Sequence, residues 1–304
     1  MTSANQDVRN AQDVRNTQDI QNTGRILDIQ KTEETEEMEE TKKTEETERA
    51  QDAPLHTERL AEGLREQTAG FAHAVAGRDP DARVPTCPEW SLGTLVGHVG
   101  QEHRWTARLV RERRQLAVPD PREARPGPPD EWAGWLREGA EELIGAIRET
   151  GAKTVIETFF GPRPAGFWLR RMLGDTGVHH YDAAFATGTA FGIADDLAAD
   201  VIGEHLGLLA EPAFQAVRPA LVEPRGRGER IGFRPGSGRG WLVTRTPEGP
   251  RWARGATGDA DVVVSGAVTD LMLVVSGRVA PEDERLSVTG DRVLLHHWLA
   301  RSAL

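Results

Sequence analysis

Residues 91–110 read SLGTLVGHVGQEHRWTARLV, and their periodicity predicts an amphipathic helix that runs to about residue 116. Ser91 stands at the expected N-cap, where its hydroxyl can accept a hydrogen bond from a backbone N–H of the first turn. Spacings of three and four residues define one stripe along this helix, made of Leu95, His98, Val99, Glu102, Trp105 and Leu109. His98 and Glu102 therefore interrupt a face that otherwise points inward. His103 is expected on the flank of the helix.

A second helix, over about 167–187, carries a stripe of the same kind. Its members are Trp168, Met172, Asp175, Thr176, His179 and Ala183. An inward carboxylate or imidazole without a partner is costly, but two such helices can satisfy each other's groups, and a bound cation would satisfy all of them. Imidazole and carboxylate donors without nearby thiolates favour zinc or another divalent first-row metal. A solvated pair at i, i+4 is the alternative.

Other residues of the second helix leave alternatives open. Gly174 and Gly177 are unfavourable in a helix interior, so they indicate either the close approach of a bound group or tight helix packing. Asp182 either orients His179 or His180 through a hydrogen bond or faces solvent.

The rest of the body predicts an α+β protein. Further amphipathic helices are expected over about 56–76, 131–149 with Asp130 as N-cap, and 194–210, so that residues 53–212 form a helical bundle. Beyond residue 220, short runs with strand-like alternation are divided by Gly and Pro turns. Together with a helix over 268–278 and a terminal helix begun by Asp291, they predict a small unit with an antiparallel sheet, residues 213–304.

Charge and composition set further limits. Residues 1–52 contain 14 acidic and 7 basic side chains and few apolar ones, which predicts a disordered acidic tail. The remainder has no basic field that would suggest nucleic acid as a partner. No apolar stretch reaches about 18 residues, so no transmembrane helix is expected. The single cysteine, Cys87, is typical of a cytoplasmic protein.

Several segments resemble landmarks of one family. VPTCPEWSLGTLVGHVGQEHRW (84–105) resembles the first conserved segment of the mycothiol-dependent maleylpyruvate isomerase family, and RRMLGDTGVHHYDAAFATG (170–188) resembles its second. LAADVIGEHL (197–206), ADVVVSGAVTDLMLVVSGR (260–278) and VTGD (288–291) are similar to its later landmarks. The resemblance covers about residues 55–304. It implies a DinB-like four-helix bundle followed by a C-terminal α/β domain.

The resemblance also implies a site and a reaction. Its metal ligands correspond to His98, Asp175 and His179, which would bind zinc or another divalent metal and leave a position for the thiolate of mycothiol. The implied reaction on a small-molecule substrate is thiol addition to a conjugated carboxylate, rotation and elimination, or a thiol S-transfer. Arg278 is the candidate catalytic cation for substrate carboxylates or a developing enolate. A surface arginine is the alternative.

Some residues depart from the family pattern or stay ambiguous. Asp175 occupies a position where the family usually has Glu, so Glu102 is a further candidate ligand. His180–Tyr181 replaces the usual Arg-Trp, and this replacement predicts altered contacts to the thiol or the substrate. Cys87 is interpreted as part of a structural turn rather than as a reactive thiolate. A non-enzymatic metal-binding or ligand-binding module remains the alternative to an enzyme.

Overall fold

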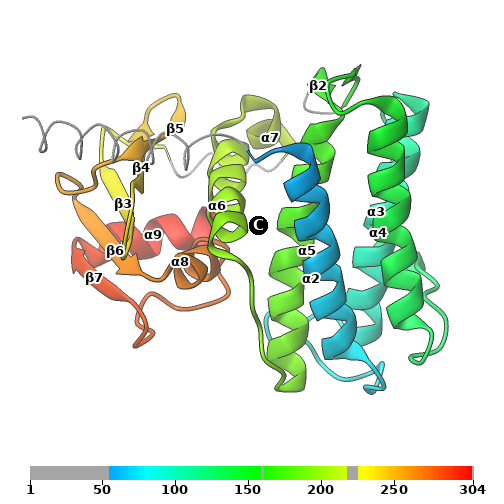
Figure 1. The fold of residues 1–304 in the computed structure, drawn as a ribbon. Coiled ribbons are helices and arrows are strands. Elements are labelled where there is room, and N and C mark those ends of the chain that lie inside the picture. The colour runs from blue at the N-terminus through cyan, green and yellow to red at the C-terminus, as the bar shows by residue number, and fades with distance from the viewer. Residues whose placement is uncertain (1–54, 159–160, 218–224, 303–304) are drawn as a thin grey trace, which may run out of the picture. The chain divides into compact units, whose positions relative to one another are not determined.

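Four long helices pack through the apolar stripes that the sequence predicts (Figure 1). The computed structural model describes residues 55–158, 161–217 and 225–302, so the predicted tail over 1–52 lies outside the described residues. The four helices are α2 (Thr57–Val75), α3 (Leu92–Glu112), α4 (Trp132–Thr150) and α5 (Gly166–Thr187). Residues of all four helices contribute to the buried core, which accounts for the amphipathic patterns in the sequence.

The helix ends follow local chemistry in most places. The Ser91 hydroxyl accepts a hydrogen bond from the backbone N–H of Thr94 at 3.3 Å, which confirms the predicted N-cap of α3. Gly151 ends α4 with φ 87°, a conformation that favours glycine. The prediction for Asp130 is wrong: the N-cap of α4 is Glu131, which has helical dihedral angles and forms no side-chain capping bond.

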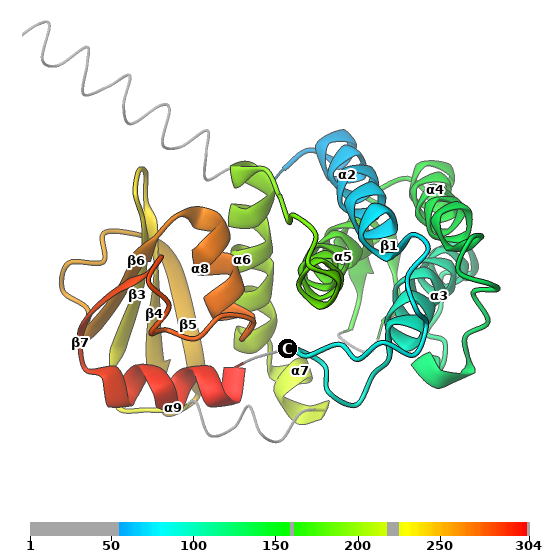
Figure 2. The same ribbon diagram turned by 90° about the horizontal axis from the view of Figure 1, so that it is seen from below.

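Two further helices connect the bundle to a sheet. The helix α6 (Asp195–Ala210) ends before Pro212, as expected, but that proline also begins a short helix, α7 (Pro212–Val217). Proline suits a first helical position because its missing N–H has no partner there in any helix. Both views place α6 between α5 and the sheet, and its buried residues share a core with the strands (Figures 1 and 2). The boundary at 212/213 stays a prediction.

The sheet is mixed rather than wholly antiparallel. Its five strands lie in the order β5-β4-β3-β6-β7, and their bounds are β3 (Arg230–Pro235), β4 (Gly240–Thr246), β5 (Gly249–Gly255), β6 (Val262–Gly266) and β7 (Ser287–Gly290). Neighbours pair antiparallel except β3 and β6, which run parallel. That pair cannot be inferred from alternation, because strand direction depends on how the chain between them crosses.

The helices α8 (Val268–Val275) and α9 (Arg292–Ser302) complete the core of the sheet (Figure 2). Asp291 caps α9 by accepting from the backbone N–H of Leu294 at 3.0 Å, as predicted. The α+β class with an N-terminal helical bundle is thus confirmed. Within the described ranges, no helix is long and apolar enough to cross a membrane.

The connectors are short. Residues 151–165 contain a two-stranded ribbon, β1 (Val155–Ile156) and β2 (Arg163–Pro164), and the proline-rich segment before α4 contains one turn of 3-10 helix, η1 (Pro121–Glu123). The loop over 76–91 joins α2 to α3 and carries Cys87 and Trp90. This loop and the facing sides of α3 and α5 surround the candidate site.

Candidate metal centre

The structure brings His98, Asp175 and His179 together. One potential ligand atom from each lies within 4.8 Å of the other two. The Asp175 Oδ2 atom is 3.4 Å from His98 Nε2 and 3.9 Å from His179 Nε2. The two imidazoles meet edge to face, with ring centroids 4.9 Å apart. Two imidazole nitrogens and one carboxylate oxygen are a donor set that suits zinc and other divalent first-row metals.

The surroundings of His179 fit this donor set. Its Nδ1 atom is 2.8 Å from Asp182 Oδ2 in a buried contact. A carboxylate that accepts the Nδ1 proton leaves the lone pair on Nε2, the atom that faces Asp175. Burial raises the pKa of Asp175, but His179, His98 and Arg171 outweigh it and hold this pKa well below its usual value. The carboxylate is therefore ionised, as a metal ligand must be.

Asp182 is held from a second side by Arg278. The guanidinium donates from Nε to Oδ1 and from Nη2 to Oδ2, both at 3.1 Å, across 96 residues of sequence. Asp182 is fully buried, so the prediction that it faces solvent is wrong. Its contact with His179 agrees with the alternative, that it orients this histidine. Burial raises the pKa of Asp182, but its bonds to His179 and Arg278 lower it far more. Arg278 thus reaches the cluster through Asp182, and its role toward a substrate stays a prediction.

Trp90 covers the two imidazoles, which the sequence did not reveal. Its ring centroid lies 4.9 Å from that of His98 and 5.7 Å from that of His179. The residue directly precedes the cap Ser91, so the chain enters α3 with this ring against the cluster. The sequence contained one signal for this contact, namely an aromatic residue just before a helix that carries an inward histidine. The same pattern is typical of an ordinary core residue.

Glu102 lies near the cluster but outside the group of three. It is 8% exposed, and burial together with the charge of Asp175 raises its pKa to about 7. The donor atoms that converge belong to His98, Asp175 and His179, so the structure gives no support to Glu102 as a ligand. A carboxyl group with a pKa near neutrality can both accept and return a proton.

Cys87 is close to the cluster yet poorly suited to be a thiolate. Its Sγ atom lies 3.6 Å from Asp182 Oδ2. Burial and the charge of Asp182 raise the pKa of this thiol to about 11. Cys87, His179 and Asp182 form a second group with metal-ligand spacing, but Arg278 already pairs with the carboxylate of that group. The structural interpretation of Cys87 agrees with these contacts.

The glycines of α5 face neighbouring protein. A Cβ atom on Gly174 would lie 3.4 Å from Glu204 Oε2, and one on Gly177 would lie 3.5 Å from the side chain of Ile193. Both distances are ordinary van der Waals contacts, so a Cβ atom would fit at either position, and the two alternatives for these glycines stay predictions. His180 is also packed in the core, where its Nδ1 is 2.9 Å from Gln67 Oε1.

His103 is fully inside the bundle, and the expectation of a flanking position is wrong. It is 1% exposed, and its Nε2 lies 2.8 Å from the hydroxyl of Thr176 on α5. Burial lowers its pKa from 6.5 to about 4. His103 follows Glu102 directly, so helical spacing alone did not show whether its side chain points into the bundle. The hydrogen bond to Thr176 on α5 shows that it does.

This burial predicts a loss of stability in mild acid. Above pH 6.5 His103 is neutral in both states, whereas between pH 6.5 and 4 only the unfolded chain takes up the proton, so the free energy of unfolding falls. The contribution is on the order of 3 kcal/mol at pH 4. Urea titrations of metal-free protein should show a steeper decline for the wild type than for His103→Gln. Parallel curves for the two proteins would show that His103 does not titrate in this way.

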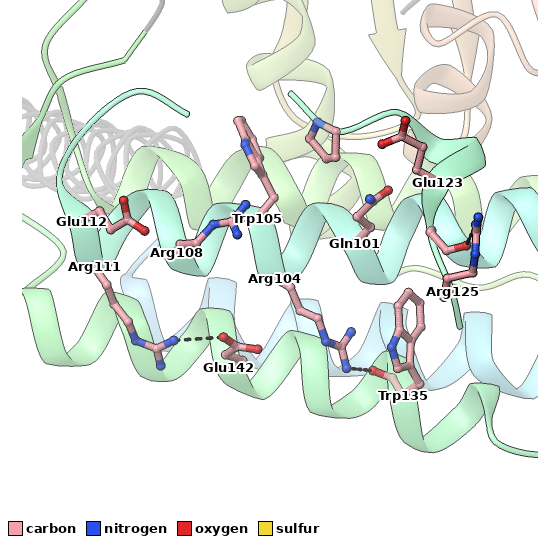
Figure 3. Close-up of a pocket in the computed structure, with 12 residues that line it drawn as sticks. Gln101, Arg104, Trp105, Arg108, Arg111, Glu112, Glu123, Arg125, Trp135 and Glu142 are labelled. Carbon is pink, nitrogen blue, oxygen red and sulfur yellow. Dashed lines mark hydrogen bonds and ion pairs between the residues drawn. The ribbon is translucent and has the colours of Figure 1, made fainter. Parts of the chain in front are cut away.

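A cavity of about 620 Å³ lies elsewhere, between α3, α4 and the segment 119–125. In Figure 3, Arg104 donates to the backbone carbonyl of Trp135 and Arg111 pairs with Glu142. The Arg104 guanidinium also lies 4.4 Å from the centre of the Trp135 ring. None of the three converging donor residues lines this cavity.

Comparison with known proteins finds one family whose model matches most of the bundle. Residues 61–184 match the profile of the mycothiol maleylpyruvate isomerase N-terminal domain. The matched range contains His98, Asp175, His179 and Asp182, whereas Arg278 and all of α6 lie outside it. The resemblance stated from the sequence is thus confirmed.

Solved structures extend the likeness over most of the chain. The crystal structure of the mycothiol-dependent maleylpyruvate isomerase is 15% identical, covers 77% of this chain and 93% of its own, and has a TM-score of 0.52. A variant of that enzyme with a histidine replaced by alanine gives the same values. These structures share the fold of this chain. No curated protein matches the chain.

Proposed function

We propose that this chain is a metal- and thiol-dependent enzyme of the maleylpyruvate isomerase type, in which His98, Asp175 and His179 hold Zn²⁺ or another divalent cation. The convergence of their three donor atoms within 4.8 Å carries the proposal. Three protein ligands would leave a coordination position for a small molecule, as in catalytic rather than structural zinc sites. Mycothiol is the proposed thiol, because the matched domain and the neighbouring enzyme carry its name.

The cation, when bound, supplies a lowered thiol pKa and so a nucleophile at neutral pH. Residues of this chain orient the ligands, exclude water and transfer the proton. Asp182 keeps the proton of His179 on Nδ1, Trp90 shields one side of both imidazoles from water, and the Glu102 carboxylate accepts the thiol proton. Arg278 holds Asp182 in place, and its direct action on a substrate carboxylate remains part of the proposal.

The proposed chemistry balances without an external oxidant or reductant. A carbon–sulfur bond forms when the thiolate adds to a double bond conjugated with a carboxylate or ketone. Rotation about the resulting single bond follows, and elimination breaks the carbon–sulfur bond to return thiolate and the isomerised alkene. The addition leaves the electron pair of the double bond on the conjugated carbonyl as an enolate. If this enolate takes up the proton that Glu102 received from the thiol, the sulfur stays on the product and the reaction is a thiol S-transfer.

Two measurements test the proposal on the full chain. Metal analysis should find about one divalent ion per chain, because one three-ligand site is proposed. Calorimetry of the zinc-loaded protein should show heat on addition of mycothiol, and maleylpyruvate should isomerise only when both are present. Stoichiometric metal without mycothiol binding or turnover would favour the non-enzymatic alternative.

Glu102→Gln separates proton transfer from metal binding. We expect the variant to keep its metal, because Glu102 lies outside the ligand group, but to lose about 100-fold or more in kcat, the usual contribution of a general base. Steady-state kinetics measures kcat, and metal analysis of the same preparation measures the bound metal. Glu112→Gln, at an exposed position later in α3, serves as the control. Loss of metal in Glu102→Gln would instead make Glu102 a ligand.

A further inference from the structure

The two oxygens of Asp175 have different partners. Oδ2 faces the imidazoles of His98 and His179, whereas Oδ1 accepts a hydrogen bond from Arg171 Nη2 at 3.2 Å. Arg171 lies one turn earlier on α5, and its guanidinium contacts Oδ1 rather than the oxygen that faces the two histidines. Oδ1 is thereby hydrogen-bonded to Arg171, and Oδ2 remains as the oxygen that can bind a cation together with His98 and His179.

Arg171 is itself tied to a different helix. Its Nη1 donates to Glu204 Oε2 on α6 at 3.3 Å. The Glu204 side chain is 4% exposed, and its second oxygen, Oε1, has no hydrogen-bond partner among the described residues. A buried carboxylate oxygen without a hydrogen-bond partner lowers the free energy of unfolding. Packing of α5 against α6 therefore does not by itself account for a glutamate at this position.

We propose that Arg171 and Glu204 are positioning residues for the metal ligand Asp175, so that α6 takes part in the metal centre. The inference rests on the proposed metal site. Arg171 anchors Oδ1 and thereby presents Oδ2 as a single ligand oxygen. Glu204 balances the positive charge of the Arg171 guanidinium, so that the negative charge of Asp175 remains available to a bound cation. The pair therefore fixes both the geometry and the charge of a carboxylate that is one methylene shorter than glutamate.

The neighbouring ion pair provides a matched control. Arg170 joins the same two helices through Asp200, with 2.8 Å between Nε and Oδ2, and it has no contact with Asp175 among the interactions of the described residues. Arg170→Met and Arg171→Met thus each remove one guanidinium that bridges α5 and α6. Only the second removes a partner of Asp175.

The test compares these variants by metal affinity and by spectroscopy. Competition with a chromogenic chelator should show that Arg171→Met binds Zn²⁺ about 10- to 100-fold more weakly, as expected for loss of a hydrogen bond to a ligand. The visible spectrum of the Co²⁺-loaded variant should change in band position or intensity, because Asp175 can rotate and change its coordination. Arg170→Met should keep the wild-type spectrum and Zn²⁺ affinity even if its melting temperature falls.

Glu204→Gln is the second variant, because it keeps the size of the side chain and one acceptor oxygen but removes the negative charge. We expect weaker Zn²⁺ binding with a Co²⁺ spectrum close to that of the wild type, since Arg171 still holds Oδ1. Unchanged Zn²⁺ affinity and spectrum in Arg171→Met, in a protein whose metal is lost on His98→Ala, would overturn this inference alone. Metal retained in His98→Ala would instead overturn the proposed site.

Discussion

Replacing His98 or His179 by alanine is expected to abolish stoichiometric metal binding. Each supplies one of three donors that converge within 4.8 Å, and two remaining donors cannot hold a divalent ion against competing buffer ligands. The loss in affinity should exceed the roughly 100-fold that removal of an outer hydrogen-bond partner costs. Elemental analysis after dialysis against a weak chelator measures it directly.

The control for these variants is His73→Ala. His73 is exposed on α2 and belongs to neither group of converging donors. It should keep its metal, and all three variants should keep their helical circular dichroism. Unchanged metal content in both His98→Ala and His179→Ala would show that the proposed site is wrong. Loss of metal in His73→Ala as well would indicate binding that does not depend on the cluster.

The second large effect is expected for Asp182→Ala. The substitution leaves Arg278, whose side chain is 9% exposed, without the carboxylate that pairs with it, and it frees Nδ1 of His179. Breaking a buried ion pair by removing one partner costs about 3 to 5 kcal/mol of stability. Metal affinity should fall about 10- to 100-fold as well, because the ring of His179 is no longer oriented. Urea unfolding and chelator competition measure the two losses separately.

A double-mutant cycle with Arg278→Met isolates the ion pair. If the cost of Asp182→Ala comes from a buried guanidinium that has lost this carboxylate, the double variant should be more stable than Asp182→Ala alone. Metal affinity should stay low in the double variant, because His179 remains without its acceptor. Additive losses of stability would mean that Asp182 and Arg278 do not act as a pair, and the orienting role of Arg278 would then fail.

The helical half of the fold could be predicted because its causes are local. The Ser91 hydroxyl caps a backbone N–H three residues away, Gly151 adopts a conformation that suits glycine, and the apolar stripes repeat along one helix at a time. His98, Asp175 and His179 stood out for the same reason, since each is a costly group on an otherwise apolar stripe. The sheet was predicted less completely, because the parallel pairing of β3 with β6 depends on the path of the chain between them.

The partners of these groups came only from the tertiary structure. Stripe positions alone determined that imidazole and carboxylate face inward on two helices. They did not determine that Asp182 joins His179 to Arg278 across 96 residues, that Arg171 joins Asp175 to Glu204, or that His103 is buried against Thr176. The physical reason is that periodicity and capping act over a few residues of one helix. Hydrogen bonds between distant segments form only where packing of the whole core brings their atoms within reach.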